Sequence, residues 1–241
     1  DLCIVTTAIE QKEYMSVVTE AIRQMFPREG YANRMENVTH GMMRFASGKM
    51  SSRRGNVVTG ESLIRDAKEA IMEIIKDRDF TDTEKKEVAE AVGVAAIKYS
   101  ILRSGLGNDI IFDFDKSISF EGDSGPYLQY AATRARAICR KAEEGGVKSS
   151  LKVPTDSTIA VERILERFPS VAYRAMEERE PHYIATYLME LSGCFNNFYA
   201  REHIIDANDP TSPYKVAVAG AVAVVMIKGL HLLGIKIPEK M

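Results

Sequence analysis

The sequence predicts a mainly α-helical protein in which a short α/β segment precedes a long series of helices. Residues 1 to about 60 alternate short apolar runs with glycine-rich turns. From Thr59 onward, apolar residues recur at the three- and four-residue spacing of amphipathic helices. Prolines punctuate the second half, which predicts helices over 157–168, 170–179, 181–201 and 213–233. At 241 residues the chain has room for one large domain or two smaller ones.

The chain opens on an unbroken apolar run, Leu2 to Val5, which is typical of a strand covered on both faces in a parallel sheet. Such a strand needs neighbours. Neither an initiator methionine nor a signal-like segment precedes it. We therefore expect Asp1 to be an internal point of a longer protein. Near the other end, Gly234 follows a helical pattern as a C-terminal capping glycine does.

The middle of the chain predicts two helices and a hairpin. The first helix starts at Glu61 and Ser62, and the second opens with the capping box Thr81-x-x-Glu84 and ends near residues 104–105. Two apolar runs, 110–112 and 118–120, flank Asp115-Lys116. This spacing predicts a β-hairpin, although the turn lacks the favoured glycine.

The helix that follows Ser124-Gly125-Pro126 has two distinct faces. At 100° per residue, its core-facing arc holds Leu128, Ala131, Ala132, Ala135, Cys139 and Ala142. Another sector holds Tyr127, Tyr130, Arg134 and Lys141. Aromatic rings beside cations can stack unpaired bases and contact phosphate, so this face could hold single-stranded RNA. The alternative is that the tyrosines are half-buried packing residues whose hydroxyls stay in water.

Composition excludes several classes. The 32 Lys+Arg nearly balance the 34 Asp+Glu, and from residue 121 onward the counts are 15 and 15, so RNA binding would depend on a local patch, for which we expect Arg136, Arg140 and Lys141. Three widely spaced cysteines fit neither a metal site nor a disulfide framework. The longest apolar run, 216–227, is shorter than the ~20 residues that span a bilayer. We expect a cytoplasmic protein without a membrane anchor.

The loop from Gly48 to Asn56 concentrates three cations, two hydroxyls and two glycines. Glycines allow close backbone approach, and Lys and Arg donate charge-assisted hydrogen bonds to oxygen anions, so the loop could bind phosphate. A solvated basic loop is the alternative. A P-loop is excluded, because Gly41 and Gly48 enclose six residues and Lys49 is followed by Met50.

Read as a whole, this loop resembles the KMSKS signature of class I aminoacyl-tRNA synthetases, in the KMSxR form found in arginyl-tRNA synthetases. The resemblance to the C-terminal half of that family covers nearly the whole chain. Its other carriers are Ala8-Ile9-Glu10-Gln11, His40-Gly41-Met42-Met43, Arg53-Arg54-Gly55-Asn56-Val57-Val58, Gly125-Pro126-Tyr127-Leu128-Gln129-Tyr130-Ala131 with Arg134, Asn197-Phe198-Tyr199, Leu233-Gly234-Ile235 and Pro238-Glu239-Lys240-Met241.

The resemblance implies three parts. Residues 1–60 would be the C-terminal remnant of a Rossmann-type α/β nucleotide-binding fold, 61–120 a helical stem-contact region with the hairpin, and 121–241 an all-helical DALR-type anticodon-binding bundle. In the stem-contact region Lys85, Lys86 and Lys98 could touch phosphate, although a charged helix face is the simpler interpretation.

The resemblance also implies a reaction and its residues. The parent enzyme would couple L-arginine to tRNA(Arg) with ATP, through arginyl-adenylate, with Mg²⁺ bound through the nucleotide rather than in a protein metal site. The implied catalytic residues are Lys49, Met50, Ser51, Ser52 and Arg53. The implied ATP contacts are His40, Gly41, Met42, Met43 and Lys49. Gln11 would contact arginine, and the anticodon contacts would be Tyr127, Tyr130, Arg134, Phe198, Tyr199 and Met241. From the residues alone, Phe195 and Phe198 are core positions.

Two departures from the family pattern matter. Ser52 stands where the general signature has its second lysine, so that charge must come from elsewhere, such as Arg53 or Arg54. The four histidines, at 40, 182, 203 and 231, form no His-x-Gly-His signature. We therefore expect this chain alone not to activate arginine. The resemblance further indicates an archaeal type of enzyme.

Two other functions remain open at this stage. One is a non-catalytic RNA-binding module derived from a synthetase, and the presence of Lys49, Met50 and Ser51 argues against it. The other is a small-molecule ligase of the same superfamily, which would have no use for the face from Tyr127 to Lys141.

Overall fold

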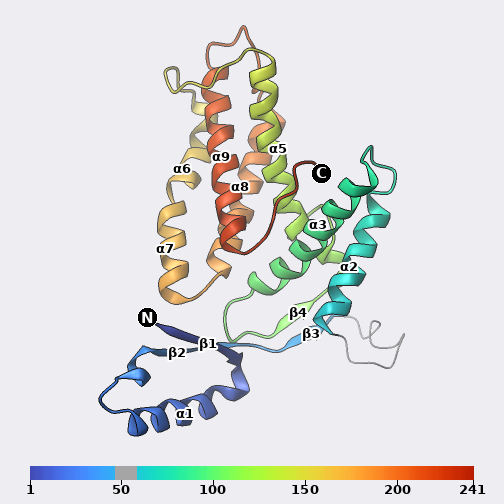
Figure 1. Ribbon diagram of the computed structural model, residues 1–241. Coiled ribbons are helices and arrows are strands. Elements are labelled where there is room, and N and C mark those ends of the chain that lie inside the picture. The colour runs from blue at the N-terminus through green and yellow to red at the C-terminus, as the bar shows by residue number, and fades with distance from the viewer. Residues whose placement is uncertain (47–58) are drawn as a thin grey trace.

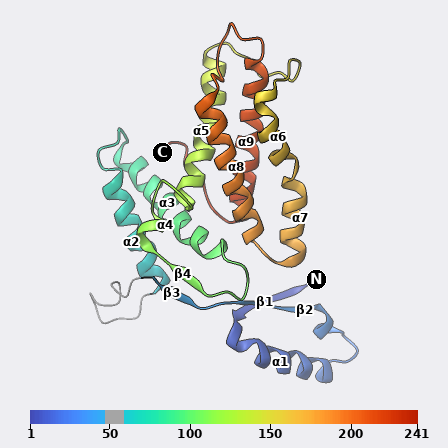
Figure 2. The same ribbon diagram turned by 180° about the vertical axis from the view of Figure 1, so that it is seen from behind.

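The computed structural model describes residues 1–46 and 59–241. It is mostly helical, as the sequence predicts, and it contains two small parallel sheets (Figure 1). A helical bundle formed by residues 125–232 stands at one end of the molecule, and the strands and helices of residues 3–40 lie at the other. The two helices of residues 60–102 lie beside the lower part of the bundle, and Figure 2 shows the same arrangement from behind.

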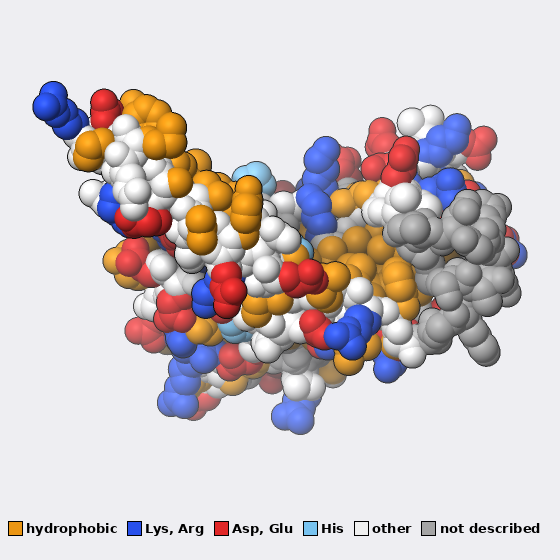
Figure 3. Space-filling view, turned by 90° about the horizontal axis from the view of Figure 1, so that it is seen from below, with side chains coloured by type: hydrophobic (Ala, Val, Ile, Leu, Met, Phe, Trp, Pro, Cys, Tyr) orange, Lys and Arg blue, Asp and Glu red, His pale blue; other side chains and the backbone are white. Residues whose placement is uncertain are grey.

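The N-terminal unit is a strand–helix–strand crossover. Strand β1 (Cys3–Ala8) pairs in parallel with β2 (Met35–His40), and the short helix η1 (Ile9–Gln11), helix α1 (Lys12–Met25) and η2 (Tyr31–Arg34) connect them. The parallel strand is confirmed. The expected cover on both faces is not found among the described residues, because Leu2 and Ile4 are 51% and 47% exposed. Hydrophobic side chains are uncovered at this end of the molecule (Figure 3).

The predicted hairpin at residues 110–120 is wrong. Strand β4 (Ile110–Phe112) pairs in parallel with β3 (Met43–Phe45), far earlier in the chain. The Asp113 carboxylate accepts the N–H of Lys116 at 3.2 Å and so caps the single-turn helix α4 (Phe114–Ser117) where the turn was expected. Ile118 and Phe120 then pack against apolar residues of α2 and α3.

Helices α2 (Gly60–Ile74) and α3 (Asp82–Leu102) begin where the sequence predicts. The Thr59 hydroxyl accepts the N–H of Ser62, and Thr81 and Glu84 form both bonds of the capping box. Such caps satisfy N–H groups that have no partner within the helix. These two helices pack together and against the small sheet of β3 and β4.

The bundle consists of α5 (Gly125–Glu144), α6 (Ile159–Glu166), α7 (Phe168–Glu178), α8 (His182–Arg201) and α9 (Ser212–Leu232), with the short helix η3 (Asp156–Thr158) before α6. Among the described helices, α9 is long and apolar enough to cross a membrane by length and composition. Half of its most apolar 18-residue stretch is buried. The helix packs on α5, α6 and α8, as the central helix of a bundle does.

Helix α5 lies close to α3 at its start. A Cβ on Gly125 would lie 2.4 Å from the Ala95 carbonyl oxygen, so only glycine permits this approach. Tyr99 of α3 is 1% exposed and donates its hydroxyl to Asp123 in the connection that precedes α5. Burial and this carboxylate raise the pKa of Tyr99 well above its ordinary value. The bundle is therefore joined to α3 by close backbone packing and by the hydrogen bond from the buried Tyr99 to Asp123.

The C-terminal tail runs back from the bundle to α3. Gly234 has φ +66°, and the N–H groups of Gly234 and Ile235 bond to His231 and Leu230, which is the predicted glycine cap. The tail carbonyls accept bonds from Lys98 at 2.5 Å and, at Lys236, from the buried Gln129 at 2.6 Å. Lys98, one of the predicted phosphate contacts, is therefore engaged within the chain.

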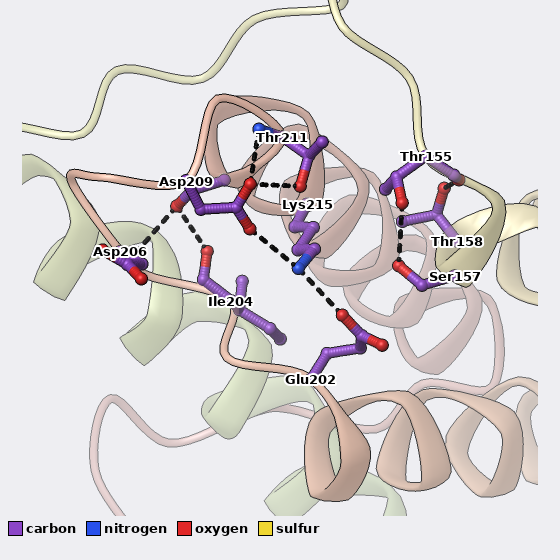
Figure 4. Close-up of polar contacts among 10 residues, drawn as sticks. Thr155, Ser157, Thr158, Glu202, Ile204, Asp206, Asp209, Thr211 and Lys215 are labelled. Carbon is purple, nitrogen blue, oxygen red and sulfur yellow. Dashed lines mark hydrogen bonds and ion pairs between the residues drawn. The ribbon is translucent and has the colours of Figure 1, made fainter.

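A cluster of charged side chains links the end of α8 to the start of α9 (Figure 4). Lys215 is 7% exposed, and its Nζ lies 2.8 Å from the Glu202 carboxylate and 3.0 Å from that of Asp209. Asp209 also accepts the Thr211 hydroxyl and N–H, at 2.7 and 2.8 Å. Since Glu202 is the C-terminal cap residue of α8, this cluster holds the end of the helix that carries Tyr199.

We expect the cluster of Lys215, Glu202 and Asp209 to stabilise the fold at neutral pH and to lose part of this contribution in acid. The Thr211 hydroxyl and N–H, together with Lys215, lower the pKa of Asp209 from 3.8 to about 2. A carboxyl with a depressed folded-state pKa stabilises the fold above its unfolded pKa, and this contribution is lost as the pH falls through the folded value. Urea titrations between about pH 5 and pH 2 should show the unfolding free energy falling more steeply for the wild type than for Asp209→Asn. If the unfolding free energies of the wild type and of Asp209→Asn fall in parallel with pH, the prediction is wrong.

Candidate nucleic-acid interface

An arginine held between two tyrosine rings is the central feature of the bundle surface. The Arg134 guanidinium carbon lies 4.7 Å from the ring centre of Tyr130, one turn earlier on α5, and 4.9 Å from that of Tyr199 on α8. Both rings reach solvent, at 37% and 44% exposure. Cation–π contacts of this kind are worth about 0.5–1 kcal/mol at exposed sites and hold the three side chains together. We name Tyr130, Arg134 and Tyr199 the tyrosine–arginine cluster.

Asn196 of α8 links Arg134 of this cluster to Tyr127 by hydrogen bonds. Asn196 was not identified as a site residue from the sequence. Its Oδ1 accepts a hydrogen bond from Arg134 Nη1 at 2.7 Å, and its Nδ2 donates to the Tyr127 hydroxyl at 2.7 Å. The Tyr127 ring is half-buried against the bundle core, as the packing alternative predicts, but its hydroxyl is bonded to Asn196. The available signal was the position of this amide, one turn before Tyr199 on the same helix.

Other predicted contacts do not reach the cluster. Phe198 is 6% exposed and packs beside Phe195, which confirms the core interpretation and removes Phe198 from the exposed rings. Met241 packs instead against the apolar residues shared by α2 and α3. Of the predicted basic patch, Lys141 is exposed and lies two turns from Arg134, within about 20° on the helix wheel. Arg136 and Arg140 lie about 200° and 240° around α5 from Arg134, so they face away from the cluster.

A second group of predicted residues lies at the carboxyl ends of β1 and β2. Ala8 pairs with His40, so Gln11, in the exposed helix η1, and the segment 40–43 come to the same edge of the parallel pair. Ligands of α/β folds bind at this edge. His40 is exposed, and its Nδ1 lies 2.8 Å from the Gly41 carbonyl oxygen.

The main chain of this segment is tightly held. A Cβ on residue 41 would lie 2.0 Å from the carbonyl oxygen of Asn108, so only glycine fits at this position. The Met42 N–H donates to Asp109 Oδ1 at 3.1 Å, and its carbonyl accepts the Ile110 N–H at 2.9 Å. A nucleotide base that contacts Met42 would therefore share these groups with Asp109 and Ile110. We name residues 40–43 the nucleotide segment.

The remaining predicted site residues, Lys49, Met50, Ser51, Ser52 and Arg53, fall outside the described residues. Within residues 1–46 and 59–241, no group of three or more His, Cys, Asp or Glu side chains comes close enough to hold a metal ion. The predicted lack of a protein metal site stays a prediction for the chain as a whole.

Comparison with known proteins assigns both halves of the chain. Residues 1–114 match the model of the class I (R) tRNA synthetase catalytic domain, and 128–241 match the DALR anticodon binding domain. Two arginine–tRNA ligases, from Leuconostoc citreum and Thermococcus kodakarensis, are each 32% identical over 96% and 100% of this chain. The chain belongs to the arginyl-tRNA synthetase family. It spans about two fifths of the length of these relatives, 41% and 39%.

Solved structures agree with this family assignment. The arginyl-tRNA synthetase of Thermus thermophilus superposes with a TM-score of 0.80 at 27% identity, covering all of this chain and 41% of that one. The Plasmodium falciparum enzyme shares the fold, with a TM-score of 0.74 at 21% identity over 99% of this chain and 41% of that one. The equal identity to the Leuconostoc and Thermococcus relatives leaves the archaeal type a prediction.

Proposed function

We propose that the chain is part of an enzyme that attaches arginine to tRNA(Arg), using ATP and passing through arginyl-adenylate, in the cytoplasm. The observation that supports this most is the tyrosine–arginine cluster, which lies in the region matched by the anticodon binding domain. Exposed rings can stack on unpaired bases, and a guanidinium can donate to bases or phosphates. The bundle would bind the anticodon loop, while residues 1–60 contribute to the ATP site and residues 61–120 contact the tRNA stem.

In this proposal Lys49 stabilises the negative charge that develops on the triphosphate when the arginine carboxylate attacks the α-phosphate. A flexible ammonium group can follow the leaving pyrophosphate as the charge spreads over phosphoryl oxygens. Ser51, Ser52 and Arg53 would support the closed loop, with Mg²⁺ entering on the nucleotide. Gln11 would contact the arginine substrate, and the nucleotide segment would hold the adenine.

The test is a binding assay with tRNA(Arg) and a tRNA of another specificity at one fixed salt concentration. The wild-type chain should prefer tRNA(Arg). Replacing Tyr130 with alanine should weaken that binding about tenfold, because a stacked base is worth about 1–3 kcal/mol. The control is Tyr173→Ala, a 63% exposed tyrosine on α7 outside the cluster, which should stay within about twofold of the wild type.

Equal affinity for both tRNAs would contradict the proposal and favour a non-catalytic RNA-binding module derived from a synthetase. Equal effects of Tyr130→Ala and Tyr173→Ala would remove the cluster from the interface. We also propose that this chain alone does not activate arginine, because its histidines form no His-x-Gly-His signature. Arginine-dependent exchange of pyrophosphate into ATP by the 241-residue chain would contradict that part.

A further inference from the structure

The turn between α7 and α8 connects the bundle to the strand–helix–strand unit. Arg179, at the end of α7, adopts a left-handed conformation with φ +58°, which is uncommon for a residue other than glycine. Its guanidinium donates to the Glu36 carboxylate of β2, at 3.3 Å from Nε and 3.1 Å from Nη2. A residue of the bundle is therefore bound to the strand that leads into the nucleotide segment.

The next residue, Glu180, binds a second element outside the bundle. Its Oε2 accepts the Leu106 N–H at 3.0 Å and lies 2.7 Å from His182 Nδ1. The His182 ring covers the same loop, because a Cβ on Gly105 would lie 3.6 Å from His182 Cε1. Both acidic and imidazole side chains are about one quarter exposed, so the contact is partly shielded from water. Hydrogen bonds with a charged acceptor are stronger than neutral ones.

The loop that Glu180 holds, residues 103–109, also touches both predicted ligand segments. Its Asn108 carbonyl packs directly on Gly41, and its Asp109 carboxylate accepts the Met42 N–H. On the other side, Gly107, with φ +79°, lies against Ile9, since a Cβ there would be 3.8 Å from Ile9 Cδ1. Ile9 is in the same short helix as Gln11. The loop therefore lies between the α7–α8 turn and the residues proposed to bind ATP and arginine.

We propose that Glu180 is a positioning residue for the nucleotide: it fixes loop 103–109, and through Asn108 and Asp109 it sets the position of Gly41 and Met42. This inference rests on the proposed function, because it assigns Glu180 a role in the same ATP site. Glu180 bonds to Leu106 and His182 and is not one of the residues proposed to touch a substrate. Its effect is transmitted by the hydrogen bond that its carboxylate accepts from the Leu106 N–H, and by the close packing of the loop on the nucleotide segment.

The first experiment measures hydrogen exchange in the 241-residue chain. Glu180→Ala should speed exchange about tenfold or more at the amides of Leu106 and Met42, because the loop loses its acceptor and the segment behind it loosens. Glu180→Gln keeps an acceptor oxygen and should stay close to the wild type. The control is Glu177→Ala, an exposed glutamate three residues earlier on α7. Unchanged exchange at Met42 in Glu180→Ala would overturn the inference.

The second experiment measures arginylation by the chain completed to the length of its relatives. Glu180→Ala should raise the KM for ATP about five- to tenfold and leave the KM for tRNA within twofold, since the tyrosine–arginine cluster is not altered. Glu180→Gln should restore most of the ATP KM. Equal increases in both KM values, or none, would overturn the inference. If the wild type does not arginylate tRNA, the proposed function fails, while the exchange experiment still decides whether Glu180 positions Met42.

Discussion

Replacing Lys215 with methionine is expected to lower the free energy of unfolding by about 2–4 kcal/mol. The Lys215 side chain is 8% exposed, and its ammonium group contacts two carboxylates, Glu202 and Asp209, whose side chains are about one quarter exposed. Methionine keeps most of the aliphatic stem but leaves the two acids facing each other without a counter-charge. Removing one member of a shielded ion pair costs more than the pair contributes, because a charge remains without its partner.

Urea denaturation at neutral pH measures this effect. The matched control is Lys228→Met on the same helix, an exposed lysine whose replacement should change the unfolding free energy by less than about 0.5 kcal/mol. Adding Glu202→Gln and Asp209→Asn to Lys215→Met should recover part of the loss. If Lys215→Met costs no more than Lys228→Met, the cluster does not stabilise the junction of α8 and α9.

Helix starts and ends were predictable because local chemistry decides them. The capping box of Thr81 and Glu84, the Ser124 cap before α5 and the glycine cap at Gly234 all appear as the sequence predicts. The core-facing arc of α5 was predictable for the same reason, since residues three and four apart share one face of a helix. Such features depend on residues within one or two turns of one another.

Contacts between distant parts of the chain were not predictable in this way. Strand β4 pairs with β3 across nearly seventy residues, and nothing local distinguishes this pairing from the hairpin that its neighbours suggested. Asn196, Lys215 and Glu180 each act through partners on another element or in a distant loop. Hydrophobic periodicity reports which face of a helix is buried, but it does not report which polar group a buried or half-buried side chain meets.

The tyrosine–arginine cluster combines a local feature that the sequence predicted with contacts between helices that it did not predict. The helical wheel placed Tyr127, Tyr130 and Arg134 in one sector but could not show that Tyr127 turns inward to Asn196 while Tyr130 stays exposed. Tyr199 joined them only through the family resemblance. The packing of α8 on α5 brings its ring to Arg134 and forms the cluster.

Within that cluster, replacing Arg134 with alanine is expected to weaken binding of tRNA(Arg) about 30- to 150-fold, which corresponds to about 2–3 kcal/mol. The guanidinium contacts the rings of both Tyr130 and Tyr199 and donates a hydrogen bond to Asn196. Its loss therefore frees both rings and leaves the Asn196 oxygen without this donor. Arg134→Lys keeps the charge but not the planar group that stacks between rings. It should weaken binding about tenfold.

The matched control is Arg136→Ala, two residues along α5 and about 200° away on the helix wheel. It removes the same charge from the same helix, and its effect should be no more than about threefold at physiological salt. Thermal unfolding of each variant should show that the bundle remains folded. If Arg134→Lys binds like the wild type, charge alone accounts for the site and the stacked geometry contributes nothing. If Arg134→Ala and Arg136→Ala weaken binding equally, the tRNA is held by a diffuse field and not by the tyrosine–arginine cluster.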